Sequence, residues 1–411
     1  MRVVVIGGGP AGMMAAGQAA AAGAAVTLLE RNDRVGRKLA ITGKGRGNVT
    51  NTADIEDIVA QFPGNGTFLY GALYRFTNDH VREFFASLGV PTVEERGGRV
   101  FPASQKASDL VAAMERFLAQ HGVRIQKGRR VSEIIVADGQ VHGVLCGNEK
   151  FAAETVILAT GGASYPATGS TGDGYRLAEK VGHSIVQPRP ALVPLVTEEP
   201  WVRELTGLAL KNVIASVLVD GRVVAEEFGE MLFTHYGLSG PIILTLSREV
   251  VKALECGKRP IIAINLKPAL TMEQLDARLL RDFQKYSRKQ FKNSLDELLP
   301  QKLIEPVVAL AGIPPELPVN QVGRQQRQKL CEVLTALPLT VTGIRSLREA
   351  IVTAGGVAVK EIDPTTMESK LVNGLYFAGE VVDIDGNTGG YNLQAAFSTG
   401  YVAGISAAVE E

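Results

Sequence analysis

Residues 1–30 read MRVVVIGGGPAGMMAAGQAAAAGAAVTLLE, and this stretch decides the fold. The apolar run Val3–Ile6 is followed by a glycine turn, an alanine-rich stretch and a second apolar run, Val26–Leu29, that ends at Glu30. This order is typical of a strand, a turn, a helix and a second strand, which together form a βαβ unit. A signal peptide is the alternative for such an apolar start, but Arg2 is its only early charge and glycines interrupt it.

The glycine turn has the spacing G-x-G-x-x-G at Gly7, Gly9 and Gly12. In this motif the first glycine permits the bend, the second lets a pyrophosphate approach the backbone, and the third lets the helix pack closely. The helix that starts at Pro10 and Ala11 presents free N–H groups and the positive end of its dipole. The turn therefore predicts dinucleotide binding, and an ordinary βαβ turn without a ligand is the alternative.

Glu30 lies at the end of the second predicted strand, where a carboxylate accepts hydrogen bonds from a ribose diol. The same charge would repel a 2′-phosphate, which favours an unphosphorylated adenosine half. A second glycine-rich and cationic segment, Arg31–Asn51, follows directly. Within it Arg37 and Lys38 are candidates to neutralise a diphosphate, and solvated surface charge is the alternative interpretation.

Composition narrows the class of protein. The chain of 411 residues is long enough for two or three domains, and its 43 Lys and Arg balance 43 Asp and Glu. Its three cysteines are far apart without a C-x-x-C pair, which argues against a redox dithiol or a cysteine zinc site and indicates a cytoplasmic location. No uninterrupted apolar stretch reaches the roughly 18 residues of a transmembrane helix, so we expect no membrane association. No spacing of residues predicts a metal site.

Periodicity divides the rest of the chain into segments. Helices are expected over residues 78–90 and 106–121, and a β-meander with a buried strand over residues 131–162. An inserted β-rich region follows over residues 192–266 and a charged helical region over residues 272–333. The chain then has a last strand over residues 374–380 and a last helix over residues 391–407.

Several motifs along the chain resemble those of the YhiN/BaiN-like flavoproteins, which are NAD(P)/FAD-dependent oxidoreductases with two dinucleotide-binding domains. These motifs are Gly36–Asn51, Ala159–Gly162, Gly169–Gly174, Gly237–Pro241, Thr353–Val357 and Ala378–Gln394. One departure is Gly47, where many members of the family have cysteine, so a thiol beside the flavin is not expected here.

The resemblance implies an α/β fold in three parts. Both chain ends, residues 1–190 and 345–411, would form a Rossmann-like FAD-binding domain. An inserted β-barrel-like domain would comprise residues 191–270 and 334–344, and a small helical bundle would comprise residues 271–333.

The resemblance also implies the cofactor contacts. Contacts to FAD are expected at Gly7, Gly9, Pro10, Ala11, Gly12, Glu30, Arg31, Arg37, Lys38, Gly43, Gly45, Asn48, Val131, Thr160, Gly161, Gly379, Glu380, Asn392 and Leu393. Asp173 has two interpretations, a helix cap or a ligand, and Gly237–Pro241 is either a sharp turn or a functional loop.

The chain contains one full Rossmann fingerprint, so NAD(P)H would bind transiently, without a domain of its own. We then expect hydride transfer through flavin N5, with one side chain handling a proton. Tyr391, at the start of the last helix, and His235, before the Gly237–Pro241 segment, are the catalytic candidates. Packing at a helix start and a surface histidine are the respective alternatives.

Three functional hypotheses follow. The first is NAD(P)H-driven reduction of an activated C=C bond in a small molecule, and the second is the same chemistry on uridine in 23S ribosomal RNA. The third is a non-catalytic flavin-binding scaffold or redox sensor. Residues 281–329 carry nine Lys and Arg against five Asp and Glu, with Tyr286 and Phe291 among them, which suits RNA phosphates and a stacked base. A solvated helix face is the alternative.

Overall fold

The computed structural model describes residues 1–409, which form two compact units. One unit comprises residues 1–191 together with the C-terminal segment from Leu347, and the other comprises Leu192–Ser346. Each unit has its own cluster of buried hydrophobic side chains. The contacts thus group the β-rich and helical parts of the insertion in one unit, and the three-part division remains a prediction.

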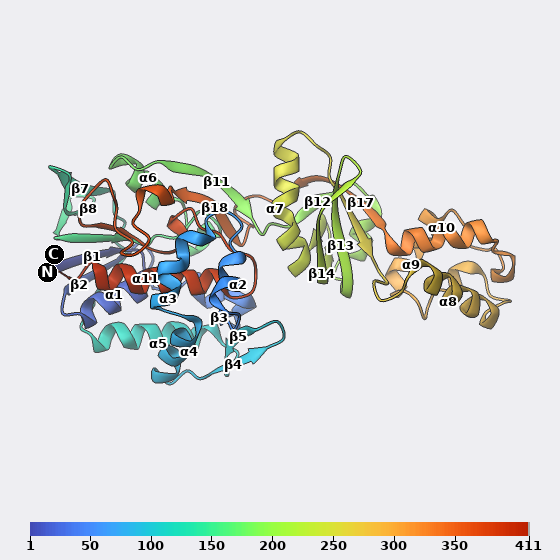
Figure 1. Ribbon diagram of the computed structural model, residues 1–411, viewed down its shortest axis with the longest axis horizontal. Helices are drawn as coiled ribbons and strands as arrows, with labels where there is room; N and C mark the ends of the chain where they lie inside the picture. Colours follow the sequence, from blue (N-terminus) through green and yellow to red (C-terminus); the bar gives the residue numbers. More distant parts are fainter. Residues whose placement is uncertain (410–411) are drawn as a thin grey trace. The chain divides into compact units, whose positions relative to one another are not determined.

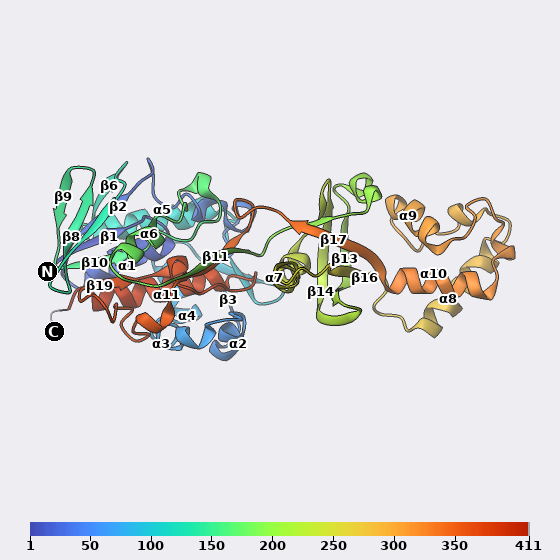
Figure 2. The same cartoon turned by 90° about the horizontal axis from the view of Figure 1, so that it is seen from above.

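A five-stranded parallel sheet organises the first unit. In spatial order its strands are β19 (Leu375–Phe377), β10 (Thr155–Leu158), β1 (Arg2–Ile6), β2 (Ala25–Glu30) and β6 (Arg124–Lys127). Each neighbouring pair is parallel, and the three inner strands are almost entirely buried, as expected for a sheet covered on both faces. The predicted Rossmann-like core is confirmed, and the first and last parts of the chain both contribute strands to it (Figures 1 and 2).

Helix α1 (Pro10–Ala21) follows β1 and packs along α11 (Tyr391–Ser406) (Figure 1). Their backbones approach so closely that a Cβ atom at Gly400 or Gly404 would lie 2.4 Å from a carbonyl oxygen of α1. On another side of α1, Gly17 accommodates the ring of Phe117 from α5 (Ala107–Gln120). The small residues of α1 are therefore required because other elements surround the helix.

The remaining elements of the first unit form its periphery. The helices are α2 (Ile55–Ala60), α3 (Tyr70–Arg75), α4 (Asn78–Ser87) and α6 (Asp173–Lys180). A small sheet is made of β3 (Thr50–Asn51), β5 (Arg99–Pro102) and β4 (Thr92–Glu95). The meander expected over residues 131–162 is β7 (Glu133–Ala137), β8 (Gln140–Cys146) and β9 (Glu149–Ala152), whereas its expected buried strand is β10, which belongs to the parallel sheet instead. Antiparallel strands β11 (Ile185–Ala191) and β18 (Val352–Val357) stand where the chain leaves and re-enters this unit.

The second unit contains a closed barrel. Its strands, in spatial order, are β12 (Leu195–Thr197), β15 (Gly237–Ser239), β14 (Arg222–Thr234), β13 (Ala209–Val219), β16 (Ile261–Asn265) and β17 (Leu337–Ile344). Helix α7 (Pro241–Glu255) packs on β14, and the charged insertion forms α8 (Met272–Lys285), α9 (Gln301–Ala311) and α10 (Arg324–Thr335). Residues 237–239 thus form a short barrel strand, and Gly240, with a φ of 94°, turns the chain into α7, so the Gly237–Pro241 segment is a strand followed by a turn.

Across residues 1–409, no helix combines the length and hydropathy that crossing a bilayer requires. In the same range, no group of three or more His, Cys, Asp and Glu side chains is arranged to hold a metal ion.

Candidate cofactor site

The glycine turn after β1 is shaped by three different constraints. Gly7 has a φ of 106°, and a Cβ atom there would lie 2.5 Å from the carbonyl oxygen of Ala159. A Cβ atom at Gly12 would lie 1.9 Å from the carbonyl oxygen of Gly7, so the helix and the turn need this glycine to pack. Gly9 differs, because a Cβ atom there would meet nothing within 4 Å. Gly9 therefore faces open space at the start of α1.

The N-terminus of α1 borders this open space. Gly9 is its N-cap residue without a side-chain cap, and Pro10 occupies the first turn, where its missing N–H costs nothing. The unpaired N–H groups of a helix start form a natural site for phosphate. Gly379, from the turn after β19, approaches so closely that its Cβ atom would lie 2.8 Å from the Cβ of Ala11. The C-terminal part of the chain thus reaches the glycine turn.

Glu30 is buried at the end of β2 and holds two segments together. One carboxylate oxygen accepts a hydrogen bond from the N–H of Gly8 at 2.7 Å. The other accepts from the backbone N–H and the side-chain amide of Asn32, both at 2.7 Å. Because each carboxylate oxygen can accept two hydrogen bonds, the oxygen bound by Gly8 can still accept a ribose hydroxyl.

The cationic segment after β2 connects the two chain ends. Lys38 donates to Glu380 at 2.6 Å and to Ser164 at 2.8 Å. Glu380 also accepts from the N–H of Thr353 at 2.8 Å and from the Ser164 hydroxyl at 3.2 Å. Arg37 contacts the Asn32 side chain at 3.2 Å. Two residues predicted separately as cofactor contacts, Lys38 and Glu380, are thus brought together as an ion pair.

The second glycine loop presents an unsatisfied acceptor. Gly43 and Gly45 have φ values of 56° and 84°, which suit the left-handed region that glycine tolerates. The side-chain oxygen of Asn48 is buried and accepts no hydrogen bond from the residues that the structure describes. Such a buried acceptor requires a donor, and a bound ligand can supply one. Arg46 points elsewhere, with its guanidinium 4.1 Å from the Phe101 ring centroid.

Gly47, where many relatives have cysteine, lies against α5. It has a φ of 77°, and a Cβ atom at this position would lie 2.7 Å from Leu110 of α5. A side chain at this position would therefore be directed at α5.

The other predicted contacts lie on neighbouring segments of the same unit. The Thr160 hydroxyl oxygen is buried without a hydrogen-bond partner in the described part of the chain, and Gly161 has a φ of 71°. Val131 is buried just before β7. Asn392 uses its side-chain amide to hold Gly386, with both hydrogen bonds at 2.8 Å, and Leu393 packs on the core.

The two catalytic candidates lie in different units. Tyr391 begins α11 in the first unit, and burial raises the pKa of its phenol, so the side chain stays protonated at neutral pH. His235 is exposed between β14 and β15 of the second unit, where its ring packs edge-on against Tyr236 at 4.8 Å.

Several positioning residues lack a signal in the sequence. Ser164 and Thr353 hold Lys38 and Glu380 through hydrogen bonds between distant segments, and Asn32 holds Glu30 from two residues along the chain. Thr353 lies in the family motif Thr353–Val357 and Ser164 lies two residues after the motif Ala159–Gly162, and no other feature of the sequence points to them.

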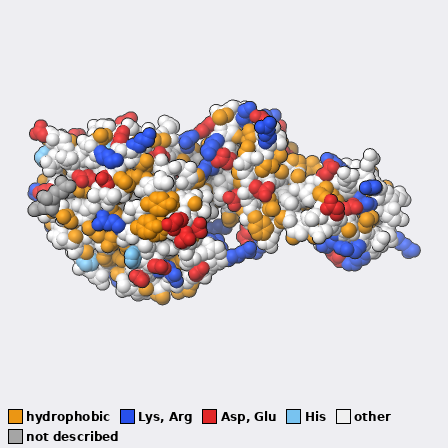
Figure 3. Space-filling view, in the orientation of Figure 1, with side chains coloured by type: hydrophobic (Ala, Val, Ile, Leu, Met, Phe, Trp, Pro, Cys, Tyr) orange, Lys and Arg blue, Asp and Glu red, His pale blue; other side chains and the backbone are white. Residues whose placement is uncertain are grey.

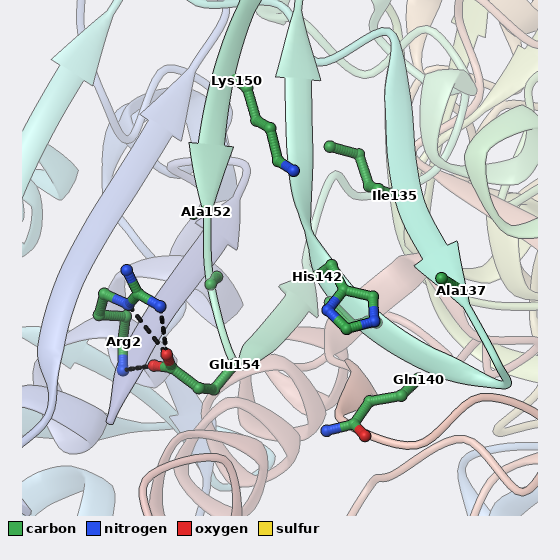
Figure 4. A pocket seen from close by; sticks show the side chains of 10 residues that line it. Arg2, Ile135, Ala137, Gln140, His142, Lys150, Ala152 and Glu154 are labelled. Atoms are coloured by element: carbon green, nitrogen blue, oxygen red, sulfur yellow. Dashed lines mark hydrogen bonds and ion pairs between the residues drawn. The ribbon is translucent and has the colours of Figure 1, made fainter.

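A surface hollow of about 490 Å³ lies elsewhere in the first unit, on the meander (Figure 4). Its lining includes His142, Lys150 and the ion pair between Arg2 and Glu154. Arg2 is the first residue of β1, so the hollow borders the amino end of that strand. Ligands of open parallel sheets bind at the carboxyl ends, and none of the predicted site residues lines this hollow.

The residues present fit FAD. The open space at Gly9 and the start of α1 suit a diphosphate, Glu30 suits a ribose, and the buried Asn48 oxygen needs a donor. The fold and this site define a flavoprotein oxidoreductase with a Rossmann-like FAD domain. The chain belongs to the HI0933-like family, because the model for the HI0933-like protein Rossmann domain matches residues 1–406.

The named relatives are of two kinds, which differ in the activity their names describe. The chain is 35% identical to the 3-dehydro-bile acid delta(4,6)-reductase of Clostridium scindens, over 99% of both chains. It is 32% identical to the ribosomal RNA dihydrouridine synthase of Haemophilus influenzae, over 98% of this chain and 97% of the relative. A solved 3-ketosteroid delta1-dehydrogenase from Sterolibacterium denitrificans aligns with a TM-score of 0.55 at 13% identity, covering 99% of both chains, which shows a shared fold.

Proposed function

We propose that the protein reduces a C=C bond conjugated to a carbonyl group, using FAD and electrons from NAD(P)H. The observation that carries this proposal is the meeting of both chain ends at the glycine turn, with Lys38 bound to Glu380 and open space at Gly9. The names of the two kinds of relative support it, because a bile acid delta(4,6)-reductase and a dihydrouridine synthase both suit addition of hydride to such a bond.

Each residue of the site has a defined task in this proposal. The start of α1 holds the diphosphate, Glu30 holds the ribose, and Asn48 accepts a hydrogen bond from the cofactor. FAD, when bound, supplies hydride transfer through N5. Lys38 and Glu380 fix the two chain segments beside the cofactor, because their ion pair is largely shielded from solvent.

Tyr391 is the proposed proton donor. Its phenol carries a proton at neutral pH and would deliver it to the carbon that does not receive hydride. Burial raises the pKa of this phenol and so works against the phenolate that remains after transfer. His235 is the second candidate. Tyr391→Phe is expected to lower the rate of substrate reduction about 100-fold without changing flavin reduction by NAD(P)H. His235→Gln serves as the comparison. If Tyr391→Phe left the rate of substrate reduction unchanged and His235→Gln lowered it, His235 would be the proton donor instead.

Ribosomal RNA is the second candidate substrate, since two relatives carry that name. Figure 3 shows Lys and Arg side chains gathered over α8 in the second unit. Several of the predicted cations are neutralised, because Lys285 binds Glu297 at 2.8 Å and Lys292 binds Glu316 at 2.5 Å. Tyr286 has Lys285 and Lys289 over its ring, at 4.9 and 4.3 Å, which leaves it poorly suited to stack a base.

Exposed Arg281, Arg288 and Lys289 are therefore the cations that would contact RNA. Neutralising these three should weaken binding to ribosomal RNA fragments and reduce its salt dependence. The control changes Lys285 and Lys292, which already have acidic partners, and should have a smaller effect. Equal effects of both sets would argue against this surface.

Stopped-flow absorbance tests the whole proposal. The oxidised protein should be yellow, NADH or NADPH should bleach it, and an enone or a uridine-containing ribosomal RNA fragment should restore the colour. Recovery with an enone alone supports a small-molecule substrate, and recovery with RNA alone supports the second candidate. Protein that binds FAD but is bleached by neither nucleotide would contradict NAD(P)H as the donor. Flavin that no acceptor reoxidises would favour a non-catalytic flavin-binding role.

A further inference from the structure

Three arginines converge on one carboxylate in the first unit. Arg31 donates to Asp173 at 2.8 Å, and Arg130 makes two parallel hydrogen bonds to it at 2.9 and 2.8 Å. Arg176 binds the same carboxylate from one turn further along α6. The Asp173 side chain is only 13% exposed, whereas those of Arg130 and Arg176 are 58% and 65% exposed. Asp173 is the first residue of α6, and the N-cap position is Gly172, so its interpretation as a helix cap is wrong.

The three arginines come from three different segments. Arg31 directly follows Glu30, the predicted contact of the adenosine ribose, at the end of β2. Arg130 directly precedes Val131, whose backbone groups we expect from the sequence to face adenine. Arg176 belongs to the same helix as Asp173 and connects it to no other segment. One carboxylate thus joins the segment after β2, the segment before β7 and the start of α6.

The loop that leads into α6 is fastened to the same place. Thr171 accepts a hydrogen bond from Arg31 at 2.6 Å, and the carbonyl oxygen of Thr168 accepts one from the Asn32 side chain at 3.0 Å. Gly169 has a φ of 107°, and a Cβ atom there would lie 2.4 Å from the Asn32 amide nitrogen. The loop therefore lies against the residues that follow Glu30.

The charge on Asp173 makes this arrangement possible. Burial acts to raise the pKa of Asp173, but hydrogen bonds from Arg130 and Arg176 and the charge of Arg31 outweigh it, so the pKa falls. The carboxylate stays ionised and offsets the repulsion among three guanidinium groups. A neutral amide could accept hydrogen bonds but could not offset that repulsion.

We propose that Asp173 is a positioning residue for the adenosine half of FAD. It holds Arg31 beside Glu30 and the backbone before Val131, which together border that half of the ligand. Asp173 itself touches no ligand in this scheme. The inference rests on the proposed function, because it assumes that FAD is the cofactor.

Asp173→Asn tests the proposal. We expect the dissociation constants of FAD and of ADP, which carries only the adenosine half, to rise by a similar factor of about ten. Flavin fluorescence measures the first, and displacement of FAD by ADP measures the second. The rate of flavin reduction at saturating FAD should not change. A loss of FAD affinity without a loss of ADP affinity would overturn the proposal, as would unchanged affinity for both.

Glu154→Gln is the matched control for removing an arginine-bound carboxylate. Glu154 binds Arg2 in the same unit, beside the meander hollow (Figure 4), and its substitution should leave both affinities unchanged. If the wild-type protein bound neither FAD nor ADP, the proposed function itself would fail, and that result is distinct from an effect of Asp173.

A second pair of variants covers the case in which Asp173→Asn does not fold. Arg130 and Arg176 are both exposed and both bind Asp173, but only Arg130 bridges two segments. Arg130→Gln should weaken FAD and ADP binding severalfold, and Arg176→Gln should leave both unchanged. Equal effects would mean that net charge alone matters, and the positioning role would be wrong.

Discussion

At the scale of single residues, neighbouring glycines of one turn have separable roles. Gly7 and Gly12 lie against backbone atoms and serve the packing of the fold, whereas Gly9 faces open space. The spacing of the three glycines and the position of Glu30 could be predicted from the sequence, because they lie within one βαβ unit. The contacts of Ser164, Thr353 and Asn32 could not, because hydroxyl and amide side chains occur in most loops, and a family motif marks a position without its partner.

This difference yields a prediction for two alanine variants. Gly12→Ala should reduce the free energy of unfolding by about 3 kcal/mol, because its Cβ atom would overlap the Gly7 carbonyl. Gly9→Ala should change that free energy by less than about 1 kcal/mol, yet raise the FAD dissociation constant at least about tenfold. Urea unfolding and flavin fluorescence measure the two quantities. A Gly9→Ala protein with normal FAD affinity would show that the phosphates lie elsewhere.

At the scale of elements, packing decides which residues each helix can contain. The alanine-rich sequence of α1 predicts a helix, but its pairing with α11 cannot be inferred from it, since the two are separated by most of the chain. The pairing becomes clear only in the structure, where Gly400 and Gly404 allow close backbone contact. The helices expected over residues 78–90 and 106–121 are α4 and α5, with ends shifted by a few residues.

The junction of α6 and β11 carries a pH-sensitive contact. The ring of His183 is fully buried and contacts Glu361 at 3.0 Å and Ser369 at 2.8 Å. Burial lowers the pKa of His183 below its ordinary value of 6.5, although Glu361 opposes this effect. Below pH 6.5 the unfolded chain therefore binds a proton that the folded protein resists, so stability decreases as the pH falls.

We expect the wild-type protein to lose stability between about pH 7 and pH 5, and His183→Gln to show a flatter profile in that range. Urea unfolding across this range measures the effect. His142→Gln, which changes an exposed histidine, is the control and should follow the wild-type profile. Parallel profiles for wild type and His183→Gln would rule out this histidine as the source of the pH dependence.

At the scale of the whole molecule, the second unit is an insertion between two adjacent strands. Ala191, the last residue of β11, pairs with Val352 of β18, so the chain leaves and re-enters the first unit at neighbouring points. Each unit has its own core, which favours independent folding.

Replacing residues 192–346 with a short Gly-Ser linker should therefore leave a first unit that folds and binds FAD. A single cooperative thermal transition and a yellow colour would support this expectation. A soluble, cooperatively folding but colourless product would show that FAD binding needs the second unit. A product that does not fold would show that the first core depends on the insertion.

The sequence by itself determined the βαβ unit, the glycine turn, the acid at the end of β2 and the family, because these depend on neighbours within a few tens of residues or on motifs in fixed order. Only the tertiary structure decided that Lys38 meets Glu380 across 342 residues of sequence and that three arginines share Asp173. The physical reason is that such contacts depend on strand order and loop paths, which bring together side chains whose separation along the chain carries no signal.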